Sequence, residues 1–220
     1  MTITPVAAAG VRGALHRPAR PSGLGLVLTH GAGGNAGAPL LVAAANAFAT
    51  AGTLALRCDL PFRQRRPRGP PSPATAAADR DGLRVAVETV RKLGAARLVL
   101  GGQSYGGRQA SILAAEFPGL VDALLLFSYP LHPPGRPDRW RTEHFSRLHL
   151  PCLFVQGAAD PFGTPAELER AIAPIPGPTR LLPVAGAGHD LKRGRFDLAP
   201  VVAAALRLAG LSGTADPPAQ

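Results

Sequence analysis

Short apolar runs alternate with amphipathic stretches along most of this sequence. Several of the runs contain no charged position, which is typical of strands buried on both faces of a parallel sheet. We predict strands at residues 23–29, 53–60, 97–101, 121–127, 152–156 and 179–184. We predict helices at residues 39–51, 76–93, 108–117, 165–172 and 196–208, with a short helix at 142–148. Strands that alternate with helices predict a doubly wound, mainly parallel sheet of the α/β class.

Three further segments complete the pattern. Residues 3–17 alternate weakly around two glycines, which predicts a hairpin at a sheet edge. Residues 62–74 and 128–140 are rich in proline and are predicted to be long loops. No linker divides the chain, and the short connections leave little room for a separate lid. We therefore predict one domain at 1–210 and a disordered tail at 211–220.

Composition narrows the class of protein. The chain has 220 residues, of which 46% are hydrophobic, which suffices for one domain with a full core. No apolar run approaches the roughly 20 residues that a membrane span needs, and residues 1–20 lack the pattern of a secretory signal. Cys58 and Cys152 lie far apart and are interpreted as buried free thiols. We expect a cytoplasmic protein with no membrane partner.

The charge of the chain raises the question of nucleic-acid binding. The net charge is +10, and 22 of the 24 Lys and Arg residues are arginine. A basic chain can bind nucleic acid. Here, however, the arginines are spread along the chain, except at 63–68, and no aromatic residues are interleaved with them. Abundant Arg, Ala, Gly and Pro with little Lys is also typical of GC-rich genomes, so we expect no nucleic-acid partner.

The motif with the clearest chemistry is Gly102-x-Ser104-x-Gly106, which lies between the strand predicted at 97–101 and a predicted helix. It matches the nucleophile elbow, in which a serine sits on a sharp, strained strand-to-helix turn. Backbone segments approach so closely there that glycine is needed two residues before and after the serine. The dipole of the following helix favours any negative charge that forms. The alternative is an ordinary glycine-rich turn in a chain with 26 glycines.

A serine nucleophile needs a base and a group that orients the base. In hydrolases with this elbow, the chain order is Ser, then Asp or Glu, then His. Asp160 follows the strand predicted at 152–156, and His189 follows the strand predicted at 179–184. The carboxyl ends of parallel strands are where catalytic groups collect. We therefore predict a Ser104–His189–Asp160 triad.

The acidic partner has competing interpretations. Asp160 alone would be read as a cap of the next helix. Asp138 is a rival to orient the base, because it follows the preceding strand. Asp190, beside His189, is more typical of a solvated or capping carboxylate. Asp59 follows an earlier strand and is interpreted as structural.

Acyl transfer also requires backbone donors for the oxyanion, each worth about 3–4 kcal/mol. The N–H of Tyr105, directly after the serine, is predicted to supply one donor. The glycine-rich turn at 30–34 follows a buried strand, and the N–H of Ala32 is predicted to supply the other. Gly33 in this turn is a candidate for substrate contact, whereas His30 is interpreted as a brace of the turn.

Four motifs carry a resemblance to a known family: Thr29-His30-Gly31-Ala32-Gly33-Gly34, Gly101-Gly102-Gln103-Ser104-Tyr105-Gly106-Gly107-Arg108, Ser128-Tyr129-Pro130-Leu131-His132-Pro133-Pro134-Gly135 and Gln156-Gly157-x-x-Asp160-Pro161-Phe162-Gly163. The chain resembles the α/β-hydrolase superfamily over nearly its whole length. Within it, the motifs look like a small, lidless, dienelactone-hydrolase-like subgroup of mostly uncharacterised bacterial proteins. That subgroup includes a testis-expressed eukaryotic relative and a subunit of a chromatin-modifying complex. The stretch around Tyr129 is specific to the subgroup, whereas the elbow is not.

The resemblance implies an eight-stranded, mostly parallel sheet and the Ser104–His189–Asp160 triad. Dienelactone hydrolases have cysteine where this chain has Ser104, so their substrate is not carried over. We expect a serine hydrolase of small carboxylic esters or thioesters that needs no metal and no organic cofactor. The alternatives are a non-catalytic interaction protein, since the eukaryotic relatives show that the fold can serve as a partner surface, and an acyltransferase or haloperoxidase-like activity on the same triad. The sequence does not indicate an oligomeric state.

Three residues are further candidates for substrate contact. Arg65 and Arg66 belong to the basic segment 62–68, which leaves the same sheet edge as Ser104 and is predicted to form part of the pocket rim. Arginines there would attract an anionic substrate. The alternative is a solvated surface loop. Tyr129 is the third candidate.

Overall fold

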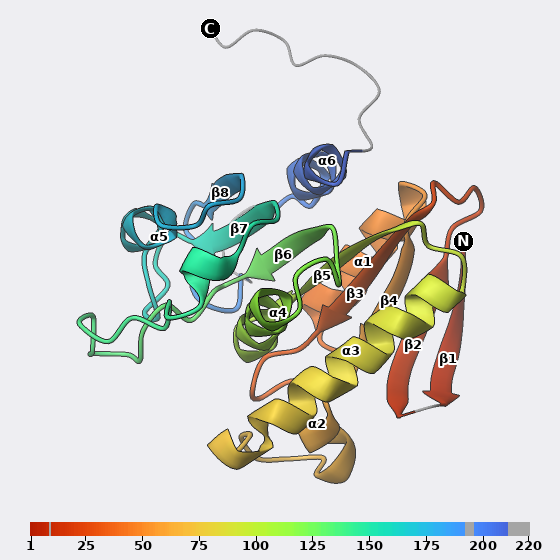
Figure 1. Ribbon diagram of the computed structural model, residues 1–220, viewed down its shortest axis with the longest axis horizontal. Helices are drawn as coiled ribbons and strands as arrows, with labels where there is room; N and C mark the ends of the chain where they lie inside the picture. The colour runs from red at the N-terminus through yellow and green to blue at the C-terminus, as the bar shows by residue number, and fades with distance from the viewer. Residues whose placement is uncertain (9, 192–195, 211–220) are drawn as a thin grey trace, which may run out of the picture.

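The computed structural model describes residues 1–8, 10–191 and 196–210, and eight strands in these residues form one twisted sheet (Figure 1). The strand order is β1-β2-β4-β3-β5-β6-β7-β8. The strands are β1 Thr2–Ala8, β2 Val11–Arg17, β3 Leu24–Thr29, β4 Leu54–Cys58, β5 Arg97–Gln103, β6 Ala123–Phe127, β7 Cys152–Gly157 and β8 Thr179–Val184. The pairs β1–β2 and β2–β4 are antiparallel, and the other pairs are parallel. The predicted α/β fold is confirmed.

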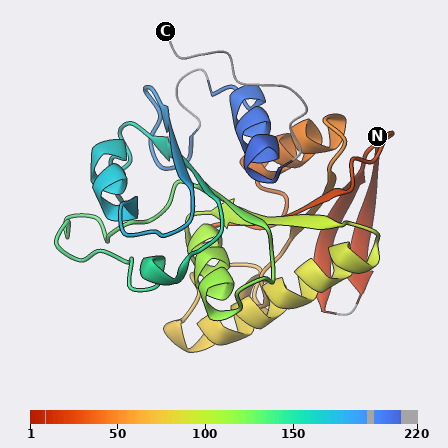
Figure 2. The ribbon, with the colours of Figure 1, turned by 45° about the horizontal axis from the view of Figure 1, so that its top comes forward.

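Helices cover both faces of this sheet, as Figure 2 shows. One face carries α1 and α6, and the other carries α3, α4 and α5. The helices are α1 Pro39–Thr50, α2 Pro61–Arg65, α3 Ala76–Lys92, α4 Tyr105–Glu116, α5 Pro165–Ile172 and α6 Ala199–Leu208. The sheet is therefore the middle of three layers, which leaves the carboxyl ends of its parallel strands free to form a site.

The central strand β3 explains why an unbroken apolar run predicted a buried strand. All six of its residues are buried. Val27 packs with the helices on one face, whereas Leu26 and Leu28 pack with α1 and α6 on the other. Both faces of the strand therefore lie in apolar layers, so alternation between apolar and polar residues is absent.

The predicted edge hairpin is also confirmed. β1 and β2 pair along their whole length, from Thr2 opposite Arg17 to Ala8 opposite Val11. Gly10 lies between the strands with φ of 81°, a conformation that glycine adopts without steric cost. The exposed strand β1 forms one edge of the sheet, and β8 forms the other.

The loop predicted at 62–74 is not entirely irregular. It begins inside the helix α2, and a 3₁₀ turn, η1 Pro73–Thr75, ends it. Pro61 stands at the first position of α2, where its missing N–H costs nothing. The backbone N–H of Phe62 is also held by the side chain of Asp79 at 2.9 Å. A tertiary contact thus supports a helix that is too short for the sequence pattern to indicate.

Three other helices differ from the prediction. The helix predicted at 108–117 is α4, which begins at Tyr105, directly after Ser104. The short helix predicted at 142–148 is only a 3₁₀ turn, η2 Phe145–Arg147. The closing helix begins at Ala199 rather than at residue 196, because Asp197 forms a turn in which its carboxylate accepts the N–H of Ala199 at 2.9 Å. Pro200 in the first turn fits a helix start at this point.

Both cysteines are free and buried, as the sequence predicted. Burial raises the pKa of the Cys58 thiol to about 12, and burial has the same effect on Cys152. Neither side chain therefore supplies a thiolate nucleophile near neutral pH.

Within the described residues, no helix combines the length and apolar character needed to cross a membrane. No separate lid domain is present in this part of the chain either. The tail predicted at 211–220 lies outside the described residues.

Candidate active site

Ser104 stands on the sharp turn between β5 and α4 that the motif predicts. Its φ is 52° and its ψ is −117°, a combination that L residues rarely adopt and that costs about 1–3 kcal/mol. A Cβ atom on Gly102 would lie 2.7 Å from the carbonyl oxygen of Thr29, and one on Gly106 would lie 2.5 Å from that of His30. Any side chain at these two positions would therefore push the elbow away from the neighbouring backbone.

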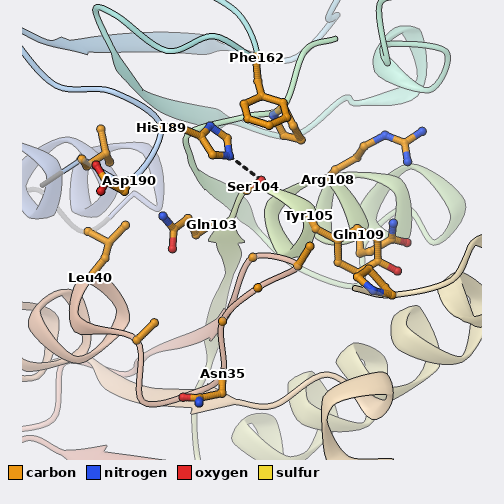
Figure 3. A pocket seen from close by; sticks show the side chains of 18 of the residues that line it. Asn35, Leu40, Gln103, Ser104, Tyr105, Arg108, Gln109, Phe162, His189 and Asp190 are labelled. Carbon is orange, nitrogen blue, oxygen red and sulfur yellow. Dashed lines mark hydrogen bonds between the residues drawn. The ribbon is translucent and has the colours of Figure 1, made fainter. Parts of the chain in front are cut away.

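The three residues of the expected triad come together at the carboxyl ends of β5, β7 and β8. The Oγ atom of Ser104 lies 2.8 Å from Nε2 of His189, as the dashed line in Figure 3 marks. Nδ1 of His189 lies 2.8 Å and 3.0 Å from the two carboxylate oxygens of Asp160. An ionised carboxylate only accepts, so the hydrogen of His189 belongs on Nδ1 and the lone pair of Nε2 faces Ser104.

Asp160 is only 2% exposed, and its carboxylate is held from three sides. Besides His189, it accepts hydrogen bonds from the Gln156 side-chain amide at 3.0 Å and from the Phe162 backbone N–H at 2.9 Å. The same Gln156 amide also donates to the carbonyl oxygen of Gly163 at 2.8 Å. Gln156 was not identified from the sequence as a functional residue, although it stands in one of the motifs that carry the family resemblance.

The other acidic candidates lie elsewhere. Asp138 is exposed in the loop that follows β6. Asp59 accepts the backbone N–H of Ala36 at 2.6 Å and the guanidinium of Arg12 at 3.0 Å, in agreement with its structural interpretation. Asp190 lines the cavity in front of Ser104.

The two predicted oxyanion donors border Ser104. Tyr105 is the first residue of α4, where a backbone N–H has no acceptor within the helix. The turn that contains Ala32 passes close to the serine, since a Cβ atom on Gly31 would lie 3.4 Å from Cβ of Ser104. A hydrogen bond from Gly34 N–H to the carbonyl oxygen of Gly31 closes this turn at 3.0 Å. The N–H groups of Tyr105 and Ala32 stay the predicted oxyanion donors, and the geometry around them is compatible with that role.

His30 braces this turn and has no free nitrogen for proton transfer. Its Nδ1 lies 2.8 Å from the carbonyl oxygen of Gly31, and its Nε2 accepts the N–H of Leu60 at 3.1 Å. Burial lowers the pKa of His30, which keeps the ring neutral. The interpretation of His30 as a structural residue is confirmed.

Arg63 is a structural residue of the same turn, so neither of the two interpretations of segment 62–68, a basic pocket rim or a solvated surface loop, holds for it. Its side chain is buried and donates to the carbonyl oxygens of Gly34 at 2.7 Å and Ala32 at 2.8 Å. It also donates to the carbonyl oxygens of Arg66 and Gly69. Arg63 thus connects the predicted oxyanion turn to α2 and the loop that follows it.

A buried aromatic contact connects α2 to the elbow. The ring of Phe62 lies edge-on to His30, with 5.6 Å between centroids, and to Tyr105, with 5.8 Å. The Tyr105 hydroxyl donates to the buried carboxylate of Asp79 at 2.8 Å. Burial and this hydrogen bond raise the pKa of Tyr105 above its ordinary value. One cluster therefore holds both proposed donor segments in place.

A cavity of about 1230 Å³ opens in front of Ser104 and His189. The glycine-rich turn lines it, including the substrate-contact candidate Gly33. Phe162 also lines it and lies over the imidazole of His189, with ring centroids 4.2 Å apart (Figure 3). This aromatic ring shields one side of the histidine from solvent.

Three of the predicted substrate contacts do not reach this cavity. Arg65 and Arg66 are exposed and are not among its lining residues, because α2 turns Arg63 inward and leaves its neighbours at the surface. Tyr129 is fully buried, and its hydroxyl donates to the carbonyl oxygen of Arg141 at 2.7 Å. Its backbone N–H donates to Gln156 at 2.8 Å. Tyr129 therefore supports the segment around Asp160 and is no substrate contact.

In the described part of the chain, no group of three or more His, Cys, Asp or Glu side chains is placed to hold a metal ion. Three side chains of the site lie within hydrogen-bond distance of one another. These comprise a hydroxyl, an imidazole with a free lone pair and a buried carboxylate, arranged in series.

A known protein family and several solved structures share this architecture. The sequence profile of the alpha/beta hydrolase domain matches residues 23–198. The fold is similar to that of dienelactone hydrolase from Anabaena variabilis, with 22% identity, coverage of 94% of this chain and 96% of that chain, and a TM-score of 0.72. It is also similar to an a/b serine hydrolase without lid from Xanthomonas campestris, with 22% identity, coverage of 88% and 87%, and a TM-score of 0.69. Est1E from Butyrivibrio proteoclasticus has 17% identity, coverage of 94% and 99%, and a TM-score of 0.71.

Proposed function

The chain belongs to the alpha/beta hydrolase family, and on that basis we propose that it is a serine hydrolase of small carboxylic esters or thioesters. The observation that carries the proposal is the series of short hydrogen bonds from Asp160 through His189 to Ser104. This series ends at a strained serine in the wall of a large cavity. Neither a structural turn nor a binding surface requires that arrangement.

In the proposed first step, Ser104 Oγ attacks the acyl carbon while Nε2 of His189 accepts its proton. The carbonyl π electrons move to oxygen, and the N–H groups of Tyr105 and Ala32 stabilise the resulting charge. The tetrahedral intermediate then collapses. The bond from the acyl carbon to the leaving oxygen or sulfur breaks, and the imidazolium of His189 returns its proton to the leaving group.

In the second step, water replaces the leaving group. His189 takes a proton from the water as the water oxygen attacks the acyl carbon. The bond from the acyl carbon to Ser104 Oγ then breaks, and the imidazolium of His189 returns the proton to Oγ, which releases the carboxylic acid and restores the enzyme. Asp160 holds the imidazole tautomer and stabilises the imidazolium in both steps. Gln156 and Phe162 keep that carboxylate in place through their hydrogen bonds.

An active-site probe tests the proposal directly. A fluorophosphonate should label the purified protein, and mass spectrometry should locate the adduct on Ser104. Ser104→Ala should abolish labelling, whereas Ser146→Ala, at an exposed serine in η2, should not reduce it. Absence of labelling in the folded wild-type protein would contradict the hydrolase proposal and favour a non-catalytic role.

The proposal involves a small-molecule substrate and assigns no nucleic-acid or membrane partner. A cytoplasmic location stays a prediction, which rests on the two free cysteines.

A further inference from the structure

Two arginines from different segments line the same cavity as Ser104. Arg108 lies on the first turn of α4, four residues after Ser104, and its backbone N–H donates to the carbonyl oxygen of Ser104 at 2.9 Å. Arg141 lies in the loop between β6 and η2, and its guanidinium donates to the carbonyl oxygen of Pro130 at 3.4 Å. Neither arginine was predicted from the sequence to contact substrate.

The charge of this pair is poorly compensated within the described residues. The nearest carboxylate oxygen to Arg108 is that of Glu143, at 3.9 Å, which is too long for a hydrogen bond, and the Glu143 side chain is 71% exposed. Nε of Arg108 is buried and has no hydrogen-bond partner in this part of the chain. Burial lowers the pKa of Arg141, and the positive charge of Arg108 lowers it further. The two guanidinium groups therefore repel each other across the wall of the cavity.

The remainder of the cavity differs in character. Leu40, Leu191, Phe196 and Leu198 line another part of it. Figure 3 shows Leu40 and Asp190 on one side of Ser104 and Arg108, with Gln109, on the opposite side. The serine thus stands between a mostly apolar region that also contains Asp190 and a cationic region, and an anionic part of a substrate is favoured on the side of Arg108.

We propose that Arg108 and Arg141 form a subsite for a carboxylate group of the substrate. This inference rests on the proposed hydrolase function and specifies its substrate class as esters or thioesters that bear a second, free carboxylate. A guanidinium pairs with a carboxylate through two parallel hydrogen bonds, and an anion between two like cations removes their mutual repulsion. The positive wall also raises the local concentration of anionic substrate.

A pair of nearly isosteric esters tests the subsite. One is an aryl monoester of glutaric acid with a free carboxylate, and the other carries a carboxamide in its place. The quantity measured is the ratio of kcat/KM for the acid to kcat/KM for the amide. We expect Arg108→Gln and Arg141→Gln each to lower this ratio by a factor on the order of 10 or more, mainly through KM of the acid. Arg108→Lys should retain part of the preference, because it keeps the charge and loses the planar fork.

Arg65→Gln and Arg66→Gln are the matched controls, because they remove the same charge outside the cavity. Both should leave the ratio unchanged. A ratio that is the same in wild type, Arg108→Gln and Arg141→Gln would overturn the subsite, as would an equal loss in the controls. Thermal melting shows whether each variant is folded. If Arg108→Gln is not folded, Arg108→Lys replaces it, and its ratio should lie below that of wild type.

A binding measurement separates this inference from the hydrolase proposal. In the Ser104→Ala background, calorimetry should detect tighter binding of the acid than of the amide, and Arg141→Gln should remove the difference. That result without hydrolysis by wild type would contradict the hydrolase proposal and retain the subsite. Hydrolysis of both esters with no preference for the acid in either assay would support the hydrolase proposal and contradict the subsite.

Discussion

The guanidinium of Arg63 donates a hydrogen bond of 2.8 Å to the carbonyl oxygen of Ala32, which precedes it by 31 residues. This contact fixes the backbone of the turn that we expect to stabilise the oxyanion. A loop that carried the same donor without such support would have to be ordered during each turnover. Arg63 therefore acts on the proposed chemistry through backbone geometry and without touching the substrate.

Arg63→Gln should lower both stability and activity. The substitution removes a buried guanidinium that donates to four backbone carbonyl oxygens, and we expect the free energy of unfolding to fall by about 2–4 kcal/mol. Urea denaturation measures this loss. Arg65→Gln is the matched control and should change stability by less than about 0.5 kcal/mol. For the folded fraction of Arg63→Gln, kcat should fall more than KM rises; an unchanged kcat would show that the turn keeps its geometry without Arg63.

Two substitutions at Ser104 separate the hydroxyl from the backbone strain. Ser104→Ala and Ser104→Gly should both lose on the order of 10⁴-fold or more in kcat, because both remove the nucleophile. Only glycine accepts φ of 52° with ψ of −117° without steric cost. We therefore expect Ser104→Gly to be more stable than Ser104→Ala by about 1 kcal/mol in urea denaturation. Equal stability of the two variants would mean that the elbow stores no strain.

Asp160 and Asp138 can be compared by the same substitution. Asp160→Asn should lose most of kcat, because the amide does not hold His189 in the tautomer that leaves Nε2 unprotonated. Asp138→Asn should change kcat little, because Asp138 is exposed in a loop. Steady-state kinetics of the two purified variants on one neutral ester measures the difference. A larger loss in Asp138→Asn would identify Asp138 as the orienting carboxylate.

His144 makes stability depend on pH. Burial lowers its pKa from 6.5 to about 4, and the charges of Arg108 and Arg147 add to the effect. The unfolded chain therefore binds a proton at this site between pH 6.5 and 4, where the folded protein does not. The neutral His144 therefore contributes about 3 kcal/mol to the free energy of unfolding above pH 6.5, and this contribution is lost as the pH falls towards 4.

Urea denaturation at several pH values checks this expectation. His144→Gln should flatten the loss of stability between pH 6.5 and 4, because glutamine does not titrate and can still bond to Ser111, which lies 2.8 Å from Nε2 of His144. His16 and His30 also have lowered pKa values and remain in the variant. The difference between the two proteins, rather than the wild-type slope, therefore reports on His144. Parallel curves would contradict the assignment.

Much of this site was predictable because its signals are local. The strand before Ser104, the glycines on either side of it and the helix after it stand within one short segment, and the order Ser, Asp, His matches a known arrangement. The residues that support or extend the site have no such signal. Arg63, Arg65 and Arg66 are alike in sequence, and only the short helix α2 decides that Arg63 faces inward.

Tyr129 and Arg108 show the same limit in another form. Both stand in motifs that the sequence analysis singled out, but the sequence does not say which side chains face the cavity. Tyr129 is buried behind the site, whereas Arg108 lines the cavity together with Arg141, a residue 33 positions away. That pairing depends on how the loop after β6 returns to α4. The pattern of apolar and polar residues predicts helices and strands and does not predict the path of this loop.

The strand order gives the members of the triad unequal mechanical support. Ser104 follows β5, which has β3 and β6 as neighbours. His189 follows β8, which pairs only with β7 among the strands of the described residues. An outermost strand detaches at a lower free-energy cost than an interior one. Detachment of β8 would withdraw the proposed base His189 and leave Ser104 in an otherwise folded sheet. We therefore expect the proposed hydrolysis to be lost on warming before the rest of the sheet unfolds.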